Sequence, residues 1–560
     1  MTLWLLFFQL CFGAPEAEVL QAELTRANAH FQTLDEIPHY IALGIVDEQW
    51  FELGSVDGAV GTGSFERARA LDIDMRVGTP KLDSTHQLRG FSGFEGSRRT
   101  RIQLPMDDGH DDVLRHILWR ELDKTYREHA ERIVMLRTNQ VVKVAEEDTA
   151  PDFEVRDPIQ AHRPVPELVI DADGWMQRIK ILAARLDDDP DVHRSTMRLK
   201  AVRQVKTFVD TEGTQLTHGN RFTRLSLTVQ TRVEDGDSID VFRAFDTHDP
   251  AHLPDESELI AWVKDAVSHL KALRSAPRGE PYTGPVLLKG KATGVFFHEV
   301  FGHRVEGHRQ KSDYEGKTFA DYVEHEILPP FIDVVDDPTQ KAHGDIDLNG
   351  YYTFDDEGVP AAPATLVEAG RFKGFLMGRS PIEGFQNSNG HGRRMTGYAP
   401  VSRMGNTIVT ARTTKSQAQL RAQLLRLVKA QGLPYGYIVE DIDGGFTMTG
   451  RVTPNAFNVR ANTTWRVYPD GRPDELVRGI DLVGTPLVAF KSVVAAGDDS
   501  AVFNGHCGAE SGYVPVSAVA PSVLVKRLEF QRKEKGADRP PLLPKPMPND
   551  GQTDIMEVVP

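Results

Sequence analysis

A histidine-rich segment between Phe296 and His308, FFHEVFGHRVEGH, contains the residue types best suited to chemistry. In the HExxH motif of zinc peptidases, two histidines four residues apart lie on one helical face and bind the metal, while the adjacent glutamate acts on a water molecule. Here His303 follows His298 by five residues, and Gly302 stands where HExxH requires the second ligand. The motif is therefore HExxxH, with Glu299 beside the first histidine.

The extra residue changes which side chains share a helical face. Five residues rotate a regular α-helix by about 140° beyond one full turn, so His298 and His303 would not meet at one ion. Glu299 and His303, four residues apart, would share a face instead. If both histidines bind metal, we expect a wide turn, a kink or a helix start between them. Gly302 tolerates distorted backbone, and a single π-bulge would bring positions i and i+5 close to alignment.

A catalytic zinc also needs a third protein ligand and an open position for water. The candidates are Glu306, His308, His391, His506 and Cys507. Sequence spacing alone does not choose among them. The chain has only two cysteines, Cys11 and Cys507, which excludes a disulfide scaffold, and a lone cysteine is commonly just a small buried hydrophobe. His308 fits a surface histidine better than a ligand, whereas Glu306 could accept a hydrogen bond from His303.

The elements that position these residues fall into two regions. In the N-terminal region, residues 111–133 place Leu114, Leu118 and Leu122 at helical spacing, and residues 255–273 predict a helix capped by Asp255 with Glu258 three residues later. Residues 221–233 alternate Leu225, Leu227 and Val229 with polar residues, as a half-buried strand does.

The C-terminal region is richer in strand patterns. A strand at residues 286–288 leads into the histidine segment, and a hairpin is expected to turn at Gly370. Residues 406–410, 435–442, 458–468 and 522–528 are further strand candidates, and residues 416–432 predict a helix.

Domain boundaries follow from these patterns and from composition. We expect an N-terminal α/β region at residues 14–277, with a subdivision considered near residues 145–166, and a C-terminal domain at residues 284–530. Residues 531–560 are polar and proline-rich, which is typical of a disordered tail. Residues 145–166 are acidic and proline-rich, and predict a solvated loop or linker.

Charge and targeting signals narrow the function further. The chain has 560 residues and a net charge of −16, which argues against nucleic-acid binding, and no later apolar run is long enough to cross a bilayer. Leu3 to Phe12 form a short apolar run in a candidate signal peptide, residues 1–13, although no Lys or Arg precedes it. A signal peptide would imply an exported or periplasmic protein. The alternatives are a cytoplasmic protein with a buried N-terminal strand, or a misassigned start.

Many separated motifs in the C-terminal region resemble the TldD/PmbA metallopeptidases, specifically the TldD-like branch that has the zinc motif. The similarity begins at VLLKGKATGVFFHEVFGHRVEG and continues in order through FIDVVDDP, TFDDEGVPAAPATLVEAGRFKGFLMGR, NSNGHGRR, SRMGNT, IVEDIDGG and FNGHCGAESGYVPV. It covers residues 284–528 and is only loose over residues 14–277.

This resemblance implies a zinc peptidase acting on short or unfolded peptides. His298, His303 and Cys507 would be the zinc ligands, and Glu299 the general base that acts on a zinc-bound water. The implied fold is α+β, with an N-terminal mixed α/β part and a C-terminal, largely antiparallel β domain carrying the HExxxH zinc site. The implied partner is a homologous subunit that lacks the zinc motif, in a heterodimer, with self-association as the alternative. The family is also associated with gyrase modulation, but the acidic composition gives a nucleic-acid role little support.

Two other functions remain open. The chain could be a non-catalytic partner subunit or binding protein of such a complex, or it could hold a structural zinc with four protein ligands and no open position. Several residues have no role that the sequence decides: Glu306, His308, Arg393, Arg394, Arg403 and Asn406. The arginines could bind peptide carbonyls or a carboxylate, but structural salt bridges explain them equally well.

Overall fold

The structure, a computed structural model, describes residues 15–87, 101–106, 111–140, 149–312, 314–451, 457–534, 539–540 and 543. The candidate signal peptide and most of the proline-rich tail lie outside the described residues. No helix in the described part of the chain combines the length and the apolar character that a membrane crossing needs.

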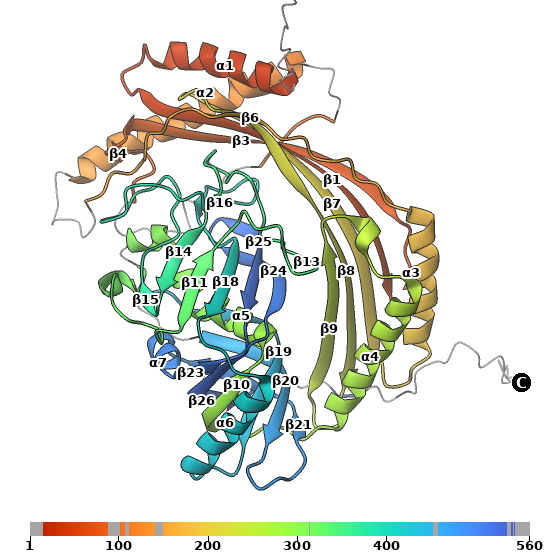
Figure 1. The fold of residues 1–560 in the computed structure, drawn as a ribbon. Coiled ribbons are helices and arrows are strands. Elements are labelled where there is room, and N and C mark those ends of the chain that lie inside the picture. The colour runs from red at the N-terminus through yellow and green to blue at the C-terminus, as the bar shows by residue number, and fades with distance from the viewer. Residues whose placement is uncertain are drawn as a thin grey trace, which may run out of the picture.

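Long antiparallel strands dominate the N-terminal region (Figure 1). The described strands form one sheet in the order β4-β3-β1-β7-β8-β6, with β2 beside β1, β5 beside β3 and β9 beside β8. The strands are β1 (Pro38–Val56), β2 (Ala59–Val60), β3 (Ser64–Thr79), β4 (Leu82–Asp83), β5 (Ile102–Gln103), β6 (Gln160–His162), β7 (Arg194–Asp210), β8 (Gln215–Arg232) and β9 (Ser238–Thr247). Strands from both sides of residues 145–166 belong to this sheet, so that segment connects two parts of one sheet.

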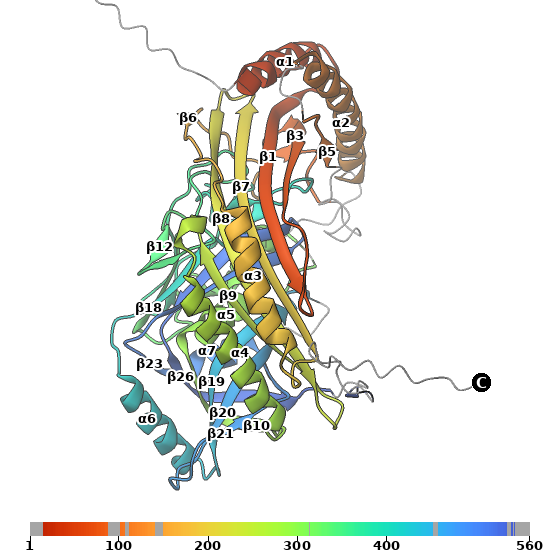
Figure 2. The same ribbon diagram turned by 90° about the vertical axis from the view of Figure 1, so that its right-hand side faces the viewer.

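Helices cover the convex face of this sheet (Figure 2). The helices are α1 (Pro15–Phe31), α2 (Asp111–Gln140), α3 (Ala172–Asp187) and α4 (Glu256–Ser275), and a short 3-10 turn, η1 (Pro250–His252), precedes α4. The alternating residues Leu225, Leu227 and Val229 of β8 are fully buried against α3 and α4, as predicted. The opposite, concave face of the sheet is turned toward the C-terminal region.

Two of the predicted helices are confirmed in detail. In α2, Leu114, Leu118 and Leu122 are buried in a core shared with α1 and β3. In α4, the Asp255 side chain accepts a hydrogen bond from Glu258 N, and the Glu258 side chain accepts one from Asp255 N. This capping box satisfies backbone donors that a helix start leaves unpaired.

The C-terminal region contains two main sheets, and α5 lies between them (Figure 1). The seven-stranded sheet consists of β10 (Tyr282–Leu288), β19 (Gly436–Thr447), β20 (Phe457–Val467), β21 (Glu475–Val477), β22 (Ile480–Gly484), β23 (Val493–Ala496) and β26 (Val523–Arg532). The six-stranded sheet consists of β11 (Ile332–Asp336), β14 (Ala364–Glu368), β15 (Arg371–Phe372), β18 (Asn406–Ala411), β24 (Ala501–Ala509) and β25 (Gly512–Ala520). Most neighbouring strands are antiparallel, and β10–β19 and β18–β25 are parallel pairs.

Smaller elements complete this region. They are α5 (Gly290–Val300), α6 (Gln417–Ala430), α7 (Pro486–Lys491), the 3-10 turns η2 (Gly302–Arg304), η3 (Gly307–Gln310) and η4 (Ala320–Tyr322), and the hairpins β12 (Ala342–His343) with β13 (Ile346–Asp347) and β16 (Gly392–Arg393) with β17 (Val401–Ser402). The expected turn at Gly370 joins β14 to β15, with φ of +77°, a conformation that glycine adopts without steric cost.

Polar contacts fix the two regions relative to each other. The buried Arg379 donates a hydrogen bond to the Tyr40 hydroxyl at 3.2 Å and pairs with Glu212 at 2.6 Å. Lys206 of β7 pairs with Asp356 at 2.5 Å. Because each pair joins residues far apart in the sequence, the concave sheet face is held at a defined position over the C-terminal sheets.

The segment at residues 149–166 is less exposed than its composition suggested. Asp152 is buried, accepts a hydrogen bond from Asp83 N at 3.0 Å and pairs with His86. Phe153 is buried between Tyr40 and the Arg379 guanidinium. The expectation of a purely solvated loop is therefore wrong here, because these side chains belong to the junction between the regions.

Candidate metal centre

The backbone between His298 and His303 is irregular, as the spacing of the motif requires. Helix α5 ends at Val300, and the separate 3-10 turn η2 begins at Gly302. Phe301 joins them with φ of −113° and ψ of −53°. The expected kink is confirmed, although it takes the form of a helix end followed by a tighter turn rather than a π-bulge.

Gly302 is required for a reason that the sequence did not reveal. A Cβ atom built at this position would lie 1.9 Å from Sδ of Met404, and Gly302 is not among the glycines with positive φ. The constraint is therefore close packing of a distant side chain rather than an unusual backbone conformation. This packing sets the turn directly against Met404, which lies between β17 and β18.

Three potential ligands converge beside this turn. One donor atom each from His298, His303 and Cys507 lies within 4.8 Å of the others, and no further histidine, cysteine or carboxylate of the described residues joins the group. His303 Nε2 is 3.3 Å from Cys507 Sγ, and the two imidazole centroids are 5.2 Å apart. All three residues are buried. These distances allow the three donor atoms to contact a single ion.

A buried carboxylate holds the second histidine. Glu306 is completely buried, and its Oε2 lies 3.3 Å from Nδ1 of His303 and 2.9 Å from Nε of Arg309. Burial alone would raise the pKa of Glu306, but His303, Arg309 and Arg403 lower it to about 2. An ionised Glu306 that accepts from Nδ1–H leaves Nε2 of His303 directed at Cys507 with its lone pair available to a metal.

Arg403 connects this carboxylate to the cysteine strand. Its Nε lies 3.2 Å from Oε1 of Glu306, and its Nη2 donates to the carbonyl oxygen of Cys507 at 2.6 Å. Burial alone would raise the pKa of the Cys507 thiol, but His303, His298 and Arg403 lower it well below its usual range. Since the thiolate is the form that binds metal, the surroundings favour ligation.

The predicted base, Glu299, lies at the end of α5. It follows His298 on the last turn of α5, is 9% exposed, and lies against Gly445 of β19. A Cβ atom at Gly445 would lie 2.6 Å from Cγ of Glu299. Gly445, a residue of β19, therefore makes room for the carboxylate.

Comparisons with known proteins cover the region that contains the cluster. Residues 281–532 match the family model of the PmbA/TldA metallopeptidase C-terminal domain. The C-terminal region of this chain therefore belongs to the TldD/PmbA family.

Curated relatives are similar to about half of the chain. A metalloprotease from Methanothermobacter thermautotrophicus is 29% identical over 269 residues, which cover 46% of this chain and 52% of that protein. A metalloprotease TldD homologue from Buchnera aphidicola is 25% identical over 280 residues, which cover 49% and 53%. The chain thus spans about half the length of the curated relatives it matches.

Solved structures extend the likeness in fold to most of the chain. TldE from Thermococcus kodakarensis has a TM-score of 0.60 at 13% identity and covers 92% of this chain and 100% of its own. A putative modulator of DNA gyrase from Thermotoga maritima has a TM-score of 0.60 at 16% identity, with coverage of 91% and 99%. The mixed α/β architecture with large antiparallel sheets is therefore that of the TldD/PmbA family.

The other candidate histidines lie outside the cluster. His308 pairs with Glu510, so the expectation of a surface histidine is wrong, since its side chain is only 17% exposed. His391 is fully buried between Asp336 and Asn389. His506 precedes Cys507 on β24, and adjacent strand residues point to opposite faces.

Sequence reasoning also missed residues that support the cluster. Arg309 pairs with Glu306, Glu315 and Glu510. In the sequence, only its closeness to the HExxxH motif could have drawn attention to it. Asn406 donates to the carbonyl oxygens of Asp337 and Gln340 and so has a structural role.

The residues of the cluster fit a zinc ion chemically. Two imidazoles and a thiolate are a common zinc donor set. Nδ1 of His298 is buried without a hydrogen-bond partner among the described residues. Buried polar atoms are rarely left unpartnered, so this atom is consistent with a metal-binding role for the ring.

Proposed function

We propose that this protein is a zinc-dependent peptidase that hydrolyses short or unfolded peptides, with His298, His303 and Cys507 as zinc ligands. The observation that carries the proposal is the convergence of these three donors within 4.8 Å, beside Glu299. The metalloprotease names of the curated relatives support the same reaction class.

The described site favours a catalytic over a purely structural zinc. A structural site is closed by four protein ligands, whereas a catalytic site keeps one position open. Here three donors converge, and within the described ranges no fourth histidine, cysteine or carboxylate joins them. This arrangement leaves a position for water or for a substrate carbonyl.

In this proposal the zinc ion and the surrounding residues have separate roles in peptide hydrolysis. A bound zinc would lower the pKa of water towards ~7 and polarise the scissile carbonyl. Glu299 accepts the proton of the attacking water and returns it to the departing amine. Gly445 leaves space for the Glu299 side chain, while Glu306 holds His303 through Nδ1. The scissile C–N bond breaks, and the products are a carboxylate and an amine.

We also propose that the working unit contains a second chain, either a homologous TldD/PmbA-type subunit or another copy of this one. The solved relatives share the whole fold with this chain, which supports assembly of homologous subunits built on one architecture. Light scattering of the purified protein, with and without a co-expressed homologue, measures this directly.

The peptidase proposal is tested by metal content and peptide digestion together. Glu299→Gln should retain zinc and lower kcat by about 10²- to 10⁴-fold, because it removes the proton acceptor but no ligand. Glu256→Gln, an equal change at an exposed position of α4, is the matched control and should keep full activity. Full activity in Glu299→Gln would refute the assigned base. A wild-type protein with neither zinc nor hydrolysis would instead favour a non-catalytic binding subunit.

A further inference from the structure

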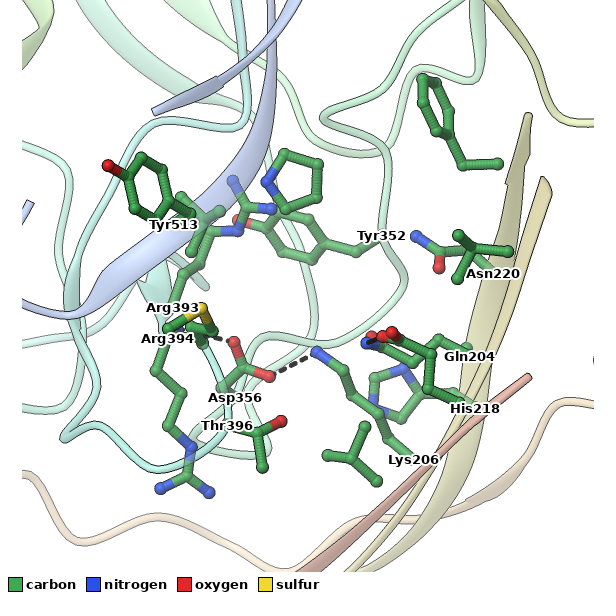
Figure 3. A pocket seen from close by; sticks show the side chains of 18 of the residues that line it. Gln204, Lys206, His218, Asn220, Tyr352, Asp356, Arg393, Arg394, Thr396 and Tyr513 are labelled. Atoms are coloured by element: carbon green, nitrogen blue, oxygen red, sulfur yellow. Dashed lines mark hydrogen bonds and ion pairs between the residues drawn. The ribbon is translucent and has the colours of Figure 1, made fainter. Parts of the chain in front are cut away.

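A second compartment lies on the other side of β24 from the metal cluster. It is a cavity of about 1110 Å³ between the concave face of the N-terminal sheet and loops of the C-terminal region. His506 lines this cavity, whereas its neighbour Cys507 faces the cluster. Figure 3 shows Gln204, Lys206, His218 and Asn220 on one wall and Tyr352, Asp356, Arg393 and Tyr513 opposite.

The sheet wall presents two rows of polar side chains. Alternate residues from Arg198 to Phe208 in β7 and from His218 to Ser226 in β8 line the cavity, because alternate residues of a strand share one face. The antiparallel register pairs Lys200 with Arg224 and Gln204 with Asn220 across the two strands. The rows therefore offer cationic and amide groups along the length of the strands, a pattern that suits an extended ligand.

Positive charge exceeds negative charge in the lining, although the whole chain has a net charge of −16. The cationic residues are Arg101, Arg198, Lys200, Lys206, Arg224, Arg393 and Arg394, and the acidic residues are Glu48, Asp72, Asp355 and Asp356. Burial raises the pKa of Asp355 well above its usual range, with the nearby Glu357 acting in the same direction, which reduces the negative charge further.

Part of this positive charge has no carboxylate partner. Lys206 pairs with Asp356, and Arg224 pairs with Asp246 through two nitrogens. Lys200, by contrast, forms no ion pair with any described residue, and its ammonium lies 5.7 Å from the centre of the Trp50 ring. Arg394 pairs with Asp72 through Nη2 at 3.7 Å, but its Nη1 is buried without a hydrogen-bond partner among the described residues.

The amide groups of the wall also keep hydrogen-bonding capacity. Gln204 donates one N–H to Glu48 at 3.0 Å, and Asn220 donates one to the carbonyl oxygen of Tyr351 at 3.4 Å. Each side chain retains its own carbonyl oxygen, which can accept from a backbone N–H of a ligand.

From these contacts we propose that the cavity binds an extended peptide segment rich in carboxylates. Lys200 and Arg394 pair with ligand carboxylates, while Gln204 and Asn220 bind its backbone. The carboxylates of Glu48 and Asp72 in the lining can accept hydrogen bonds from the backbone N–H groups of a peptide, which a polyphosphate does not have. The inference rests on the proposed peptidase function, for which it names acidic peptides as the substrate class.

Binding is measured apart from cleavage, in the Glu299→Gln protein loaded with zinc. The probes are a fluorescein-labelled dodecapeptide of alternating Glu and Ala, its Gln-Ala counterpart, and a twelve-nucleotide oligothymidylate, each followed by fluorescence anisotropy. The Glu-Ala peptide should bind at least about tenfold more tightly than the Gln-Ala peptide, and its affinity should fall as salt screens the charges. Lys200→Gln should weaken that binding about fivefold, the upper range for one exposed ion pair.

Lys264→Gln is the matched control, since Lys264 is exposed on α4 over the opposite face of the same sheet. It should leave binding of the Glu-Ala peptide unchanged. Equal affinity for the two peptides, equal effects of Lys200→Gln and Lys264→Gln, or tighter binding of the oligonucleotide would each overturn the proposal. A failure of the peptidase proposal would appear separately, as missing zinc or missing hydrolysis in the wild-type protein.

Discussion

Two neighbouring residues of β24, His506 and Cys507, face two different compartments. Cys507 lies in a compact, buried cluster with His298 and His303, and His506 lines a cavity of about 1110 Å³. In the cluster, the supporting charges are paired with one another: Glu306 contacts His303, Arg309 and Arg403. In the cavity, Lys200 has no carboxylate partner among the described residues.

The difference indicates what each compartment is prepared to bind. Buried groups that already hold each other in place cost little reorganisation when a small ion arrives, which is the arrangement expected of a metal site. A wide wall whose cationic and amide groups use only part of their bonding capacity instead suits a larger ligand that supplies further partners itself. A single strand separates the two because its side chains alternate between faces.

The first prediction removes the charge that positions His303. Glu306→Gln should weaken zinc affinity by about 10- to 100-fold, because partners that orient a ligating histidine contribute that much. Competition with a chromophoric chelator measures the affinity. Glu315→Gln is the control, since Glu315 pairs with Arg309 at 2.7 Å but is not a partner of His303. Equal losses of zinc affinity in both variants would show that Glu306 acts only through Arg309. Neither variant should change the binding of the acidic peptide in the cavity.

The second prediction moves the base without touching a ligand. Gly445→Ala places a Cβ where it would lie 2.6 Å from Cγ of Glu299, so the carboxylate must shift. We expect zinc to remain bound and kcat to fall about tenfold, within the range that misplacement of a catalytic group produces. Steady-state kinetics and metal analysis provide the two readouts. Gly61→Ala, where the nearest atom to an added Cβ is 3.6 Å away, should behave as wild type. Unchanged kinetics in Gly445→Ala would argue against the observed Glu299 position.

The third prediction concerns the cavity wall and acid stability. Burial, reinforced by Lys206, lowers the pKa of His218 from 6.5 to about 3, so the folded protein keeps this ring neutral. Between pH 6.5 and about pH 3, His218 binds a proton in the unfolded chain but not in the folded protein. The free energy of unfolding therefore decreases as the pH falls through this range. The free energy of unfolding should decrease by up to about 1.4 kcal/mol per pH unit from this group.

Chemical denaturation between pH 7 and pH 4.5 measures this dependence. His218→Asn should show a shallower loss of unfolding free energy than wild type, whereas His162→Asn, at an exposed histidine, should follow wild type. Parallel curves for wild type and His218→Asn would contradict the neutral, buried state of the ring.

Local patterns predicted the local structure well. Alternation at Leu225, Leu227 and Val229 identified β8, and Asp255 with Glu258 identified the start of α4. The five-residue spacing of His298 and His303 required an irregular backbone, which the break between α5 and η2 provides. These features depend on neighbouring residues, so their physical cause can be read from the sequence.

Local sequence patterns could not predict the contacts between segments that are distant in the sequence. Arg403 joins Glu306 to the carbonyl oxygen of Cys507, and Met404 explains Gly302, but neither residue has a spacing that predicts its partner. Cys507 itself was distinguished from the other candidate ligands only by the family resemblance. The cavity likewise arises where β7 and β8 meet loops more than a hundred residues later, a pairing that only the tertiary fold determines.

The central claim is that two imidazoles and one thiolate bind the same zinc ion. Zinc-edge X-ray absorption spectroscopy of the purified protein tests it most directly, with Cys507→Ser as the comparison. The account predicts one sulfur and two imidazole scatterers around zinc in the wild-type protein, and loss of the sulfur in Cys507→Ser. A zinc shell without sulfur, or one that Cys507→Ser leaves unchanged, would contradict it.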